Sequence, residues 1–151
     1  MSALRSSSGL QYPGVADKEH FELLMGDVDA WNTWREENPK IKPDLAYAVM
    51  RGANLPMANL SWAQLREADL VLANLRGADL RHADLSSANL VGARLMGVDL
   101  AHANICGADL STAEDLTDEQ IRQTRGDSLT KLPEQLRPPE NWATKGRSAR
   151  R

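Results

Sequence analysis

Residues 68–82 read ADLVLANLRGADLRH, in which alanine, an acidic or amide residue and leucine return every five positions. The same period extends over residues 43–112. Alanine stands two places before most of the central residues, and only Pro43 and Val98 interrupt the alanine column. The central column is apolar at every step and reads Leu45, Met50, Leu55, Leu60, Leu65, Leu70, Leu75, Leu80, Leu85, Leu90, Leu95, Leu100, Ile105 and Leu110.

A five-residue period fits neither of the two regular elements. On an α-helix, steps of five residues advance the side chain by about 140°, which scatters the leucines around the cylinder. On a flat strand, an odd step sends successive leucines to opposite faces. A chain that turns one corner in each repeat points every central residue at a common axis. The period therefore predicts a β-helix whose core is the central column, with alanine filling the tighter places.

The remaining columns suit the corners of such a coil. Asp or Asn stands before most central residues, and these short side chains bond nearby backbone in turns. Glycine occurs two places after the central residue in five repeats, where a corner needs conformational freedom.

Runs such as Ala68-Asp69-Leu70, Ala78-Asp79-Leu80 and Ala108-Asp109-Leu110 resemble the pentapeptide-repeat family. The resemblance implies an all-β solenoid, a right-handed quadrilateral β-helix with four repeats in each coil. Periodicity alone leaves a three-sided coil open. Four sides would give about 3.5 coils and a stack roughly 17 Å tall at ordinary strand spacing.

Both flanks of the repeats look suited to closing the stack. Residues 28–39, VDAWNTWREENP, resemble a leader of many bacterial family members, especially cyanobacterial ones. Apolar residues at helical spacing predict one helix from Asp17 to Asn38. At the other end the register slips at Glu114, and residues 117–120 have the form of a capping box. We expect Gly126 to stop this second helix, and the following tail, which also resembles the family's, to fold back through Leu132, Leu136 and Trp142.

These features predict five segments. Residues 1–14 are expected to be disordered, 15–42 to form an N-terminal capping helix, and 43–113 to form the β-helix. Residues 114–142 are expected to form a C-terminal cap of a short helix and an extended tail, before a disordered basic tail over 143–151. Caps are needed because the ends of a short stack expose leucine and unpaired backbone.

Composition excludes several classes of protein. The net charge of −3 is too small to indicate a polyanionic or polycationic partner. The last nine residues carry +4, which we interpret as a solubility feature rather than a nucleic-acid or membrane contact. Cys106 is the single cysteine, so a reducing compartment is indicated. With no apolar run of membrane-span or signal-peptide length, we expect a cytoplasmic protein.

The candidate sites for chemistry are few. In a coil of twenty residues, as the resemblance implies, Trp62, His82 and His102 stack, and Asp79 and Asp99 lie on the same face. His82, His102, Asp79 and Asp99 are weak candidates for metal ligands, and a solvated ladder is the favoured interpretation. Cys106 has no apparent neighbouring base. We therefore expect no catalytic residues, no resident metal, no cofactor and no small-molecule substrate.

The second candidate site is an apolar interaction patch. Outward positions of the coil carry Val71, Leu72, Val91, Met57 and Met96, and a contiguous exposed apolar patch usually marks a partner. The partner would be another protein or, most simply, a second copy in an isologous homodimer. The alternative is that the N-terminal helix or the tail covers the patch.

The leading functional hypothesis is a non-enzymatic scaffold or protein-interaction module. The family suggests one alternative, a DNA-mimicking modulator of type II topoisomerases, which would be a long and strongly acidic rod. Between residues 44 and 113 this chain carries seven acidic residues against five arginines, so that role is disfavoured. A metal-binding or enzymatic role is the least favoured.

Overall fold

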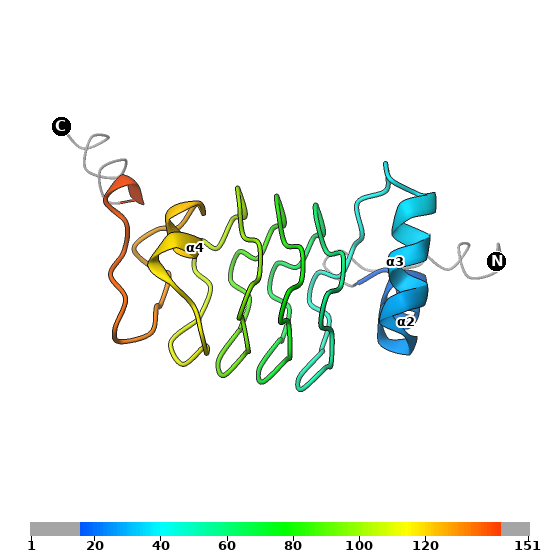
Figure 1. The fold of residues 1–151 in the computed structure, drawn as a ribbon, viewed down its shortest axis with the longest axis horizontal. Coiled ribbons are helices and arrows are strands. Elements are labelled where there is room, and N and C mark those ends of the chain that lie inside the picture. Colours follow the sequence, from blue (N-terminus) through cyan, green and yellow to red (C-terminus); the bar gives the residue numbers. More distant parts are fainter. Residues whose placement is uncertain (1–15, 143–151) are drawn as a thin grey trace.

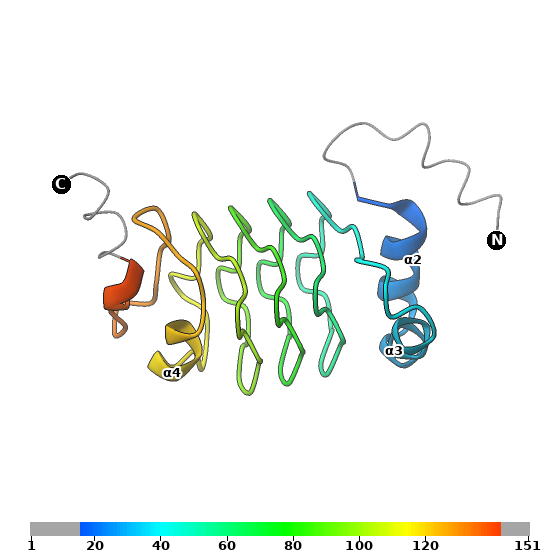
Figure 2. The same ribbon diagram turned by 90° about the horizontal axis from the view of Figure 1, so that it is seen from above.

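The computed structural model describes residues 16–142 and is a short rod of stacked coils (Figure 1). Helices α2 (Lys18–Gly26) and α3 (Val28–Glu37) lie at one end, and α4 (Asp118–Arg122) lies near the other. The view from above shows the same order along the rod (Figure 2). The two terminal segments that the sequence predicts to be disordered, residues 1–14 and 143–151, fall outside the described residues.

Backbone pairing defines a coil of twenty residues with four sides. Parallel bridges join Asp44 to Gln64, Gln64 to Asp84 and Asp84 to Asn104 along one side. The bridges of the other three sides have the same spacing within the repeats and run through positions 49, 69, 89 and 109, positions 54, 74, 94 and 114, and positions 59, 79 and 99. Each side contributes one bridged residue per coil, so the described repeats contain isolated bridges rather than extended strands.

Each corner is a tight turn with one residue in the left-handed region. At a typical corner, the Ala78 N–H donates to the Leu75 carbonyl at 2.9 Å. The third turn residue has a φ between 58° and 72° at every corner from Tyr47 to Gly107, as in a type II turn. At the corners from Tyr47 to Gly107, no Asp or Asn takes this conformation. They start the turn instead, as where Asp69 Oδ1 accepts from the Val71 N–H at 3.1 Å.

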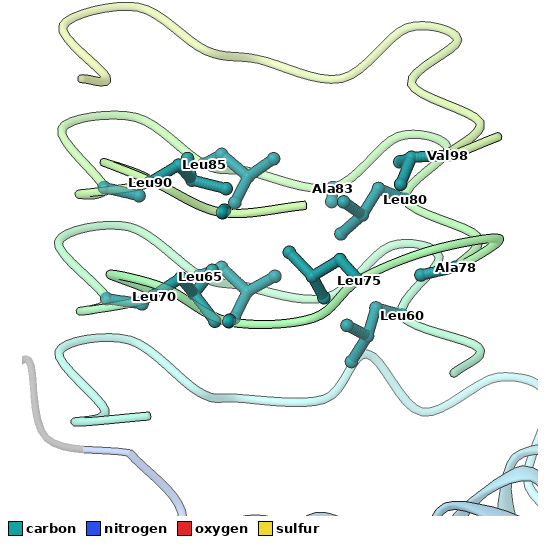
Figure 3. Packing of buried hydrophobic residues seen from close by; sticks show 14 of the residues in the cluster. Leu60, Leu65, Leu70, Leu75, Ala78, Leu80, Ala83, Leu85, Leu90 and Val98 are labelled. Atoms are coloured by element: carbon teal, nitrogen blue, oxygen red, sulfur yellow. The ribbon is translucent and has the colours of Figure 1, made fainter. Parts of the chain in front are cut away.

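The central column lies on the axis of the rod. Its members from Leu45 to Leu110 are at most 3% exposed, and most of the alanine column is equally buried. Figure 3 shows how the same side of successive coils aligns, with Leu65 beneath Leu85 and Leu70 beneath Leu90. Burial of each leucine contributes roughly 1.5–3 kcal/mol, so this column is the main source of stability.

The prediction of a single helix from Asp17 to Asn38 is wrong, because the helix is interrupted at Asp27. This residue is extended, with φ −169° and ψ 125°. Its Oδ2 accepts from the Ala30 N–H at 2.9 Å, so Asp27 is the N-cap of α3. Gly26 has a low helix propensity, which favours the end of α2 at this point. Met25, just before the break, lies on the outer face of α2 and is 41% exposed.

The C-terminal segment differs from expectation in two respects. Thr117 and Gln120 form a capping box at the start of α4, but the helix ends at Arg122 rather than at Gly126. Coil pairing then continues beyond residue 113, because Arg125 bridges Asn104 and Lys131 bridges Asp109. Trp142 is buried, and Leu132 and Leu136 pack against the core.

We expect Leu80→Lys to abolish cooperative folding, because Leu80 is 0% exposed and a buried unpaired ammonium is strongly unfavourable. The control is Arg76→Ala, at an exposed position of the neighbouring repeat, which should change stability by at most about 0.5 kcal/mol. Thermal unfolding followed by circular dichroism measures both. Equal melting temperatures for the two variants would contradict the inward and outward assignment.

Candidate interaction surfaces

One corner of the rod carries a ladder of aromatic side chains. The rings of Trp62 and His82 stack at 4.1 Å with an interplanar angle of 5°. His82 and His102 stack at 4.9 Å and 14°. The spacing follows from the coil, because residues twenty apart on paired chains lie about 4.8 Å from each other. The Lys42 ammonium lies 5.1 Å from the centre of the Trp62 ring, at the other end of the ladder.

The candidate metal ligands do not converge. Asp79 accepts two hydrogen bonds from the Arg81 guanidinium, at 2.9 and 2.7 Å, and Asp99 lies 3.9 Å from the same guanidinium. Partial burial opposes ionisation of Asp79, but the hydrogen bonds from Arg81 outweigh it and hold the pKa of this carboxyl below its usual value. His82 and His102 stack face to face, so the lone pairs in their ring planes do not meet. Within residues 16–142, no three His, Cys, Asp or Glu side chains are grouped to hold a metal ion.

The five apolar residues at outward positions divide into exposed and half-buried members. Met57, Leu72 and Met96 are 68%, 65% and 51% exposed, whereas Val71 and Val91 are only partly accessible. The three exposed residues lie on the two corners that border one side of the rod, along which Asn54, Asn74, Arg94 and Glu114 are bridged. Helices α2 and α3 lie over the end of the rod and leave these three side chains exposed.

Glycines make room for the exposed apolar side chains. Leu72 leans over Gly92 in the next coil, so that a Cβ added at Gly92 would lie 2.7 Å from Leu72 Cδ2. Met57 leans in the same way over Gly77, where an added Cβ would meet its Sδ atom. Each of these side chains therefore lies along the rod as a short apolar ridge.

Sequence reasoning missed some exposed apolar residues. Val49 is 67% exposed and lies next to Asp69 in the bridge pattern, on the side that adjoins the Leu72 corner. The sequence could have indicated this exposure, since Val49 stands where most other repeats have Asp or Asn. Leu129, 71% exposed, lies in the irregular segment after α4, where no period indicates an orientation. Cys106 is partly exposed, with Sγ 3.8 Å from the Arg125 carbonyl oxygen.

Side chains of α3 form hydrogen bonds with the backbone of the first coil. Trp31 Nε1 and Arg35 Nη1 both donate to the Asn59 carbonyl oxygen, at 2.8 and 3.0 Å. Arg35 also donates to the Ser61 carbonyl oxygen, and Asn32 Oδ1 accepts from the Asn59 N–H at 2.8 Å. Burial lowers the pKa of Arg35, although the charge of Asp79 partly opposes this shift.

Comparison with known proteins identifies the class of the chain. Residues 42–71 and 73–111 match the family model described as pentapeptide repeats, in eight copies. The β-helix of this chain is therefore built from pentapeptide repeats.

Two solved structures are similar to this chain. One is a pentapeptide repeat protein from the thylakoid lumen of Arabidopsis thaliana, with 27% identity over 60% of this chain and 58% of that one and a TM-score of 0.38. The other is a pentapeptide repeat protein, Rfr23, from the cyanobacterium Cyanothece 51142, with 28% identity over 62% of this chain and 67% of that one and a TM-score of 0.33. The match thus spans less than two thirds of the Arabidopsis protein. No curated protein matches the sequence significantly. None of the helices in residues 16–142 has the length and apolar character needed to cross a membrane.

The ridge at Leu72 generates a prediction about coupling. Gly52, Leu72 and Gly92 occupy one corner column, and Gly52 and Gly92 have the same φ of 70°. Gly52→Ala meets open space, so it should cost only backbone strain, about 1–2 kcal/mol. Gly92→Ala should cost more, because Leu72 must also move.

Adding Leu72→Ala should return the cost of Gly92→Ala to that of Gly52→Ala, as measured by urea unfolding in a double-mutant cycle. Additive effects of Leu72→Ala and Gly92→Ala would show that Leu72 does not lie against Gly92.

Proposed function

We propose that this chain is a non-enzymatic protein-interaction module that self-associates through the ridges formed by Met57 and Leu72. The observation that carries the proposal is the conformation of these two residues. Each has a positive φ in a corner column where neighbouring coils have glycine. A residue with a Cβ costs about 1–2 kcal/mol there, and neither side chain is buried in return. Binding a partner supplies the missing burial.

Electrostatics favour an apolar partner surface over a charged one. Arg51 pairs with Asp69 at 2.9 Å, Arg81 with Asp79 at 2.7 Å, and Arg94 lies 3.9 Å from Glu114. These pairs neutralise much of the charge along the rod, so little remains to attract an oppositely charged partner. The same neutralisation speaks against a DNA-mimicking role, which requires a dense and unpaired row of negative charge.

A second copy of the chain is the occupant that this surface suits best. A two-fold axis beside the rod brings the ridges of one copy against those of the other, so an apolar patch meets an apolar patch. Met96 extends the patch along the corner that carries Met57. A cytoplasmic location is part of this proposal and rests on the single Cys106, which is unpaired.

The proposal includes a division of the chain into a repeat stack of about 3.5 coils with two caps. The N-terminal cap is α2 and α3, and its support is the set of bonds that Trp31, Asn32 and Arg35 make to the first coil. The C-terminal cap is residues 114–142. Its support is the contact of Gln120 Nε2 with the Leu95 and Val98 carbonyl oxygens, both at 3.0 Å.

Self-association is tested by sedimentation equilibrium of the full chain. We expect the unmodified protein to be dimeric at about 100 µM, and the double variant Met57→Glu, Leu72→Glu to weaken dimerisation at least about tenfold. The matched control is Leu129→Glu, which places the same charge at an equally exposed apolar residue in the segment after α4. It should leave dimerisation unchanged. A monomeric unmodified protein, or equal loss of dimer in the control, would contradict the proposal.

A further inference from the structure

The aromatic ladder ends at a cavity. His102 is the last ring of the ladder, and His82 covers only one of its faces. The other face is directed toward the C-terminal end of the rod. There, a cavity of about 480 Å³ is lined by His102, Arg122, Gln123, Arg125, Asn141 and Trp142, among others. A volume of this size lies within the range of small-molecule sites.

The cavity exists because the chain is one residue short at this corner. At the regular corner, two hydrogen bonds join the coils: His82 N donates to Ala101 O, and Asn104 N donates to Ala83 O. Between Ala101 and Asn104, the upper coil has two residues, His102 and Ala103. The equivalent bonds one coil further run from His102 N to Gln123 O and from Arg125 N to Ala103 O.

Only Thr124 separates Gln123 from Arg125. Its side chain is buried and donates to the Ile121 carbonyl oxygen at 2.7 Å. The corner position that would extend the ladder beyond His102 is therefore deleted, and the cavity takes its place.

The charges around this cavity favour an anion. Within residues 16–142, no carboxylate lies at ion-pair distance from Arg125, and Arg122 has only an exposed pair with Glu119 at 3.2 Å. Such exposed pairs contribute little and are readily exchanged for another anion. Trp142 forms an apolar wall, fixed by its Nε1–H bond to the Thr124 carbonyl oxygen at 3.2 Å.

We propose that this cavity binds a planar aromatic ring that carries an anionic group. The ring takes the deleted position of the ladder and stacks on the free face of His102. The anionic group faces the guanidinium groups of Arg122 and Arg125. Ladder rings are separated by 4.1 and 4.9 Å, so a flat ligand continues a spacing that the rod already imposes. Nucleoside monophosphates have this combination of ring, charge and size.

The probe for the test is adenosine monophosphate, added to the full chain and followed by NMR of the histidine ring protons. We expect a saturable upfield shift of the His102 signals, because a stacked base shields them. Adenosine lacks the charge and should bind more weakly. Ribose 5-phosphate lacks the ring and should give no upfield shift. No saturable change up to about 10 mM nucleotide, or equal affinity for ribose 5-phosphate, would overturn the proposal.

Two variants separate stacking from charge. His102→Asn removes the ring but suits the positive φ of 63° at this position, and it should weaken binding at least about fivefold. Arg125→Gln should weaken binding of the nucleotide but not of adenosine. The matched control is Arg76→Gln, an exposed arginine at another corner, which should bind as the unmodified chain does.

Circular dichroism establishes that each variant is folded. If His102→Asn does not fold, the Arg125→Gln comparison still decides the matter. Unchanged nucleotide affinity in folded His102→Asn or in Arg125→Gln would refute the site.

Discussion

Hydrogen bonds between residues one coil apart are the interaction on which the rest of the structure depends. On a typical side, the Leu70 N–H donates to the Asn89 carbonyl at 2.8 Å and the Asn89 N–H donates to the Ala68 carbonyl at 2.9 Å. This pairing fixes the distance between coils and brings equivalent residues into columns. The leucine core, the aromatic ladder and the apolar ridges all follow from it. The same pairing leaves backbone groups open at both ends, where helices and irregular segments bond to them.

Corner positions decide what the rod displays. The central and alanine columns form the core, and most side chains of the Asp or Asn column accept hydrogen bonds at the start of the turns. The corner residue with positive φ neither belongs to the core nor starts a turn. In some repeats it is glycine, and in others it is a larger side chain such as Met57, Leu72 or His102. Both surfaces to which we assign binding, the ridges at Met57 and Leu72 and the ladder that ends at His102, are built from this position.

The β-helix was predictable because only a turn in each repeat buries the central column, although periodicity alone left the number of sides open. A leucine every five residues is buried only if the chain turns once per repeat, and the stacking of Trp62, His82 and His102 follows once the coil has twenty residues. The flanks were less predictable because they have no period. The break at Asp27 depends on a single cap, and the bridge from Arg125 to Asn104 joins segments with no common pattern. The pairing of Asp79 with Arg81 is a side-chain choice that spacing does not reveal.

The cavity beside His102 was also hidden in the sequence. It depends on the loss of one residue between Gln123 and Arg125 relative to the coil below, and this loss is recognisable only when the hydrogen bonds are known. Irregularities of this kind are where a regular solenoid acquires a concave site, since its regular faces are convex.

The most direct test of the account is the register of the coil, measured as NMR cross-peaks between backbone protons of adjacent coils. The four-sided coil predicts a contact between the amide proton of Leu80 and the α-proton of Asp99, whose carbonyl accepts from Leu80 at 2.8 Å. Corresponding contacts should recur at a spacing of twenty residues along the bridged positions. Contacts that instead join the Leu80 amide to Arg94, as a three-sided coil of five-residue repeats would require, would contradict the coil and both proposed surfaces.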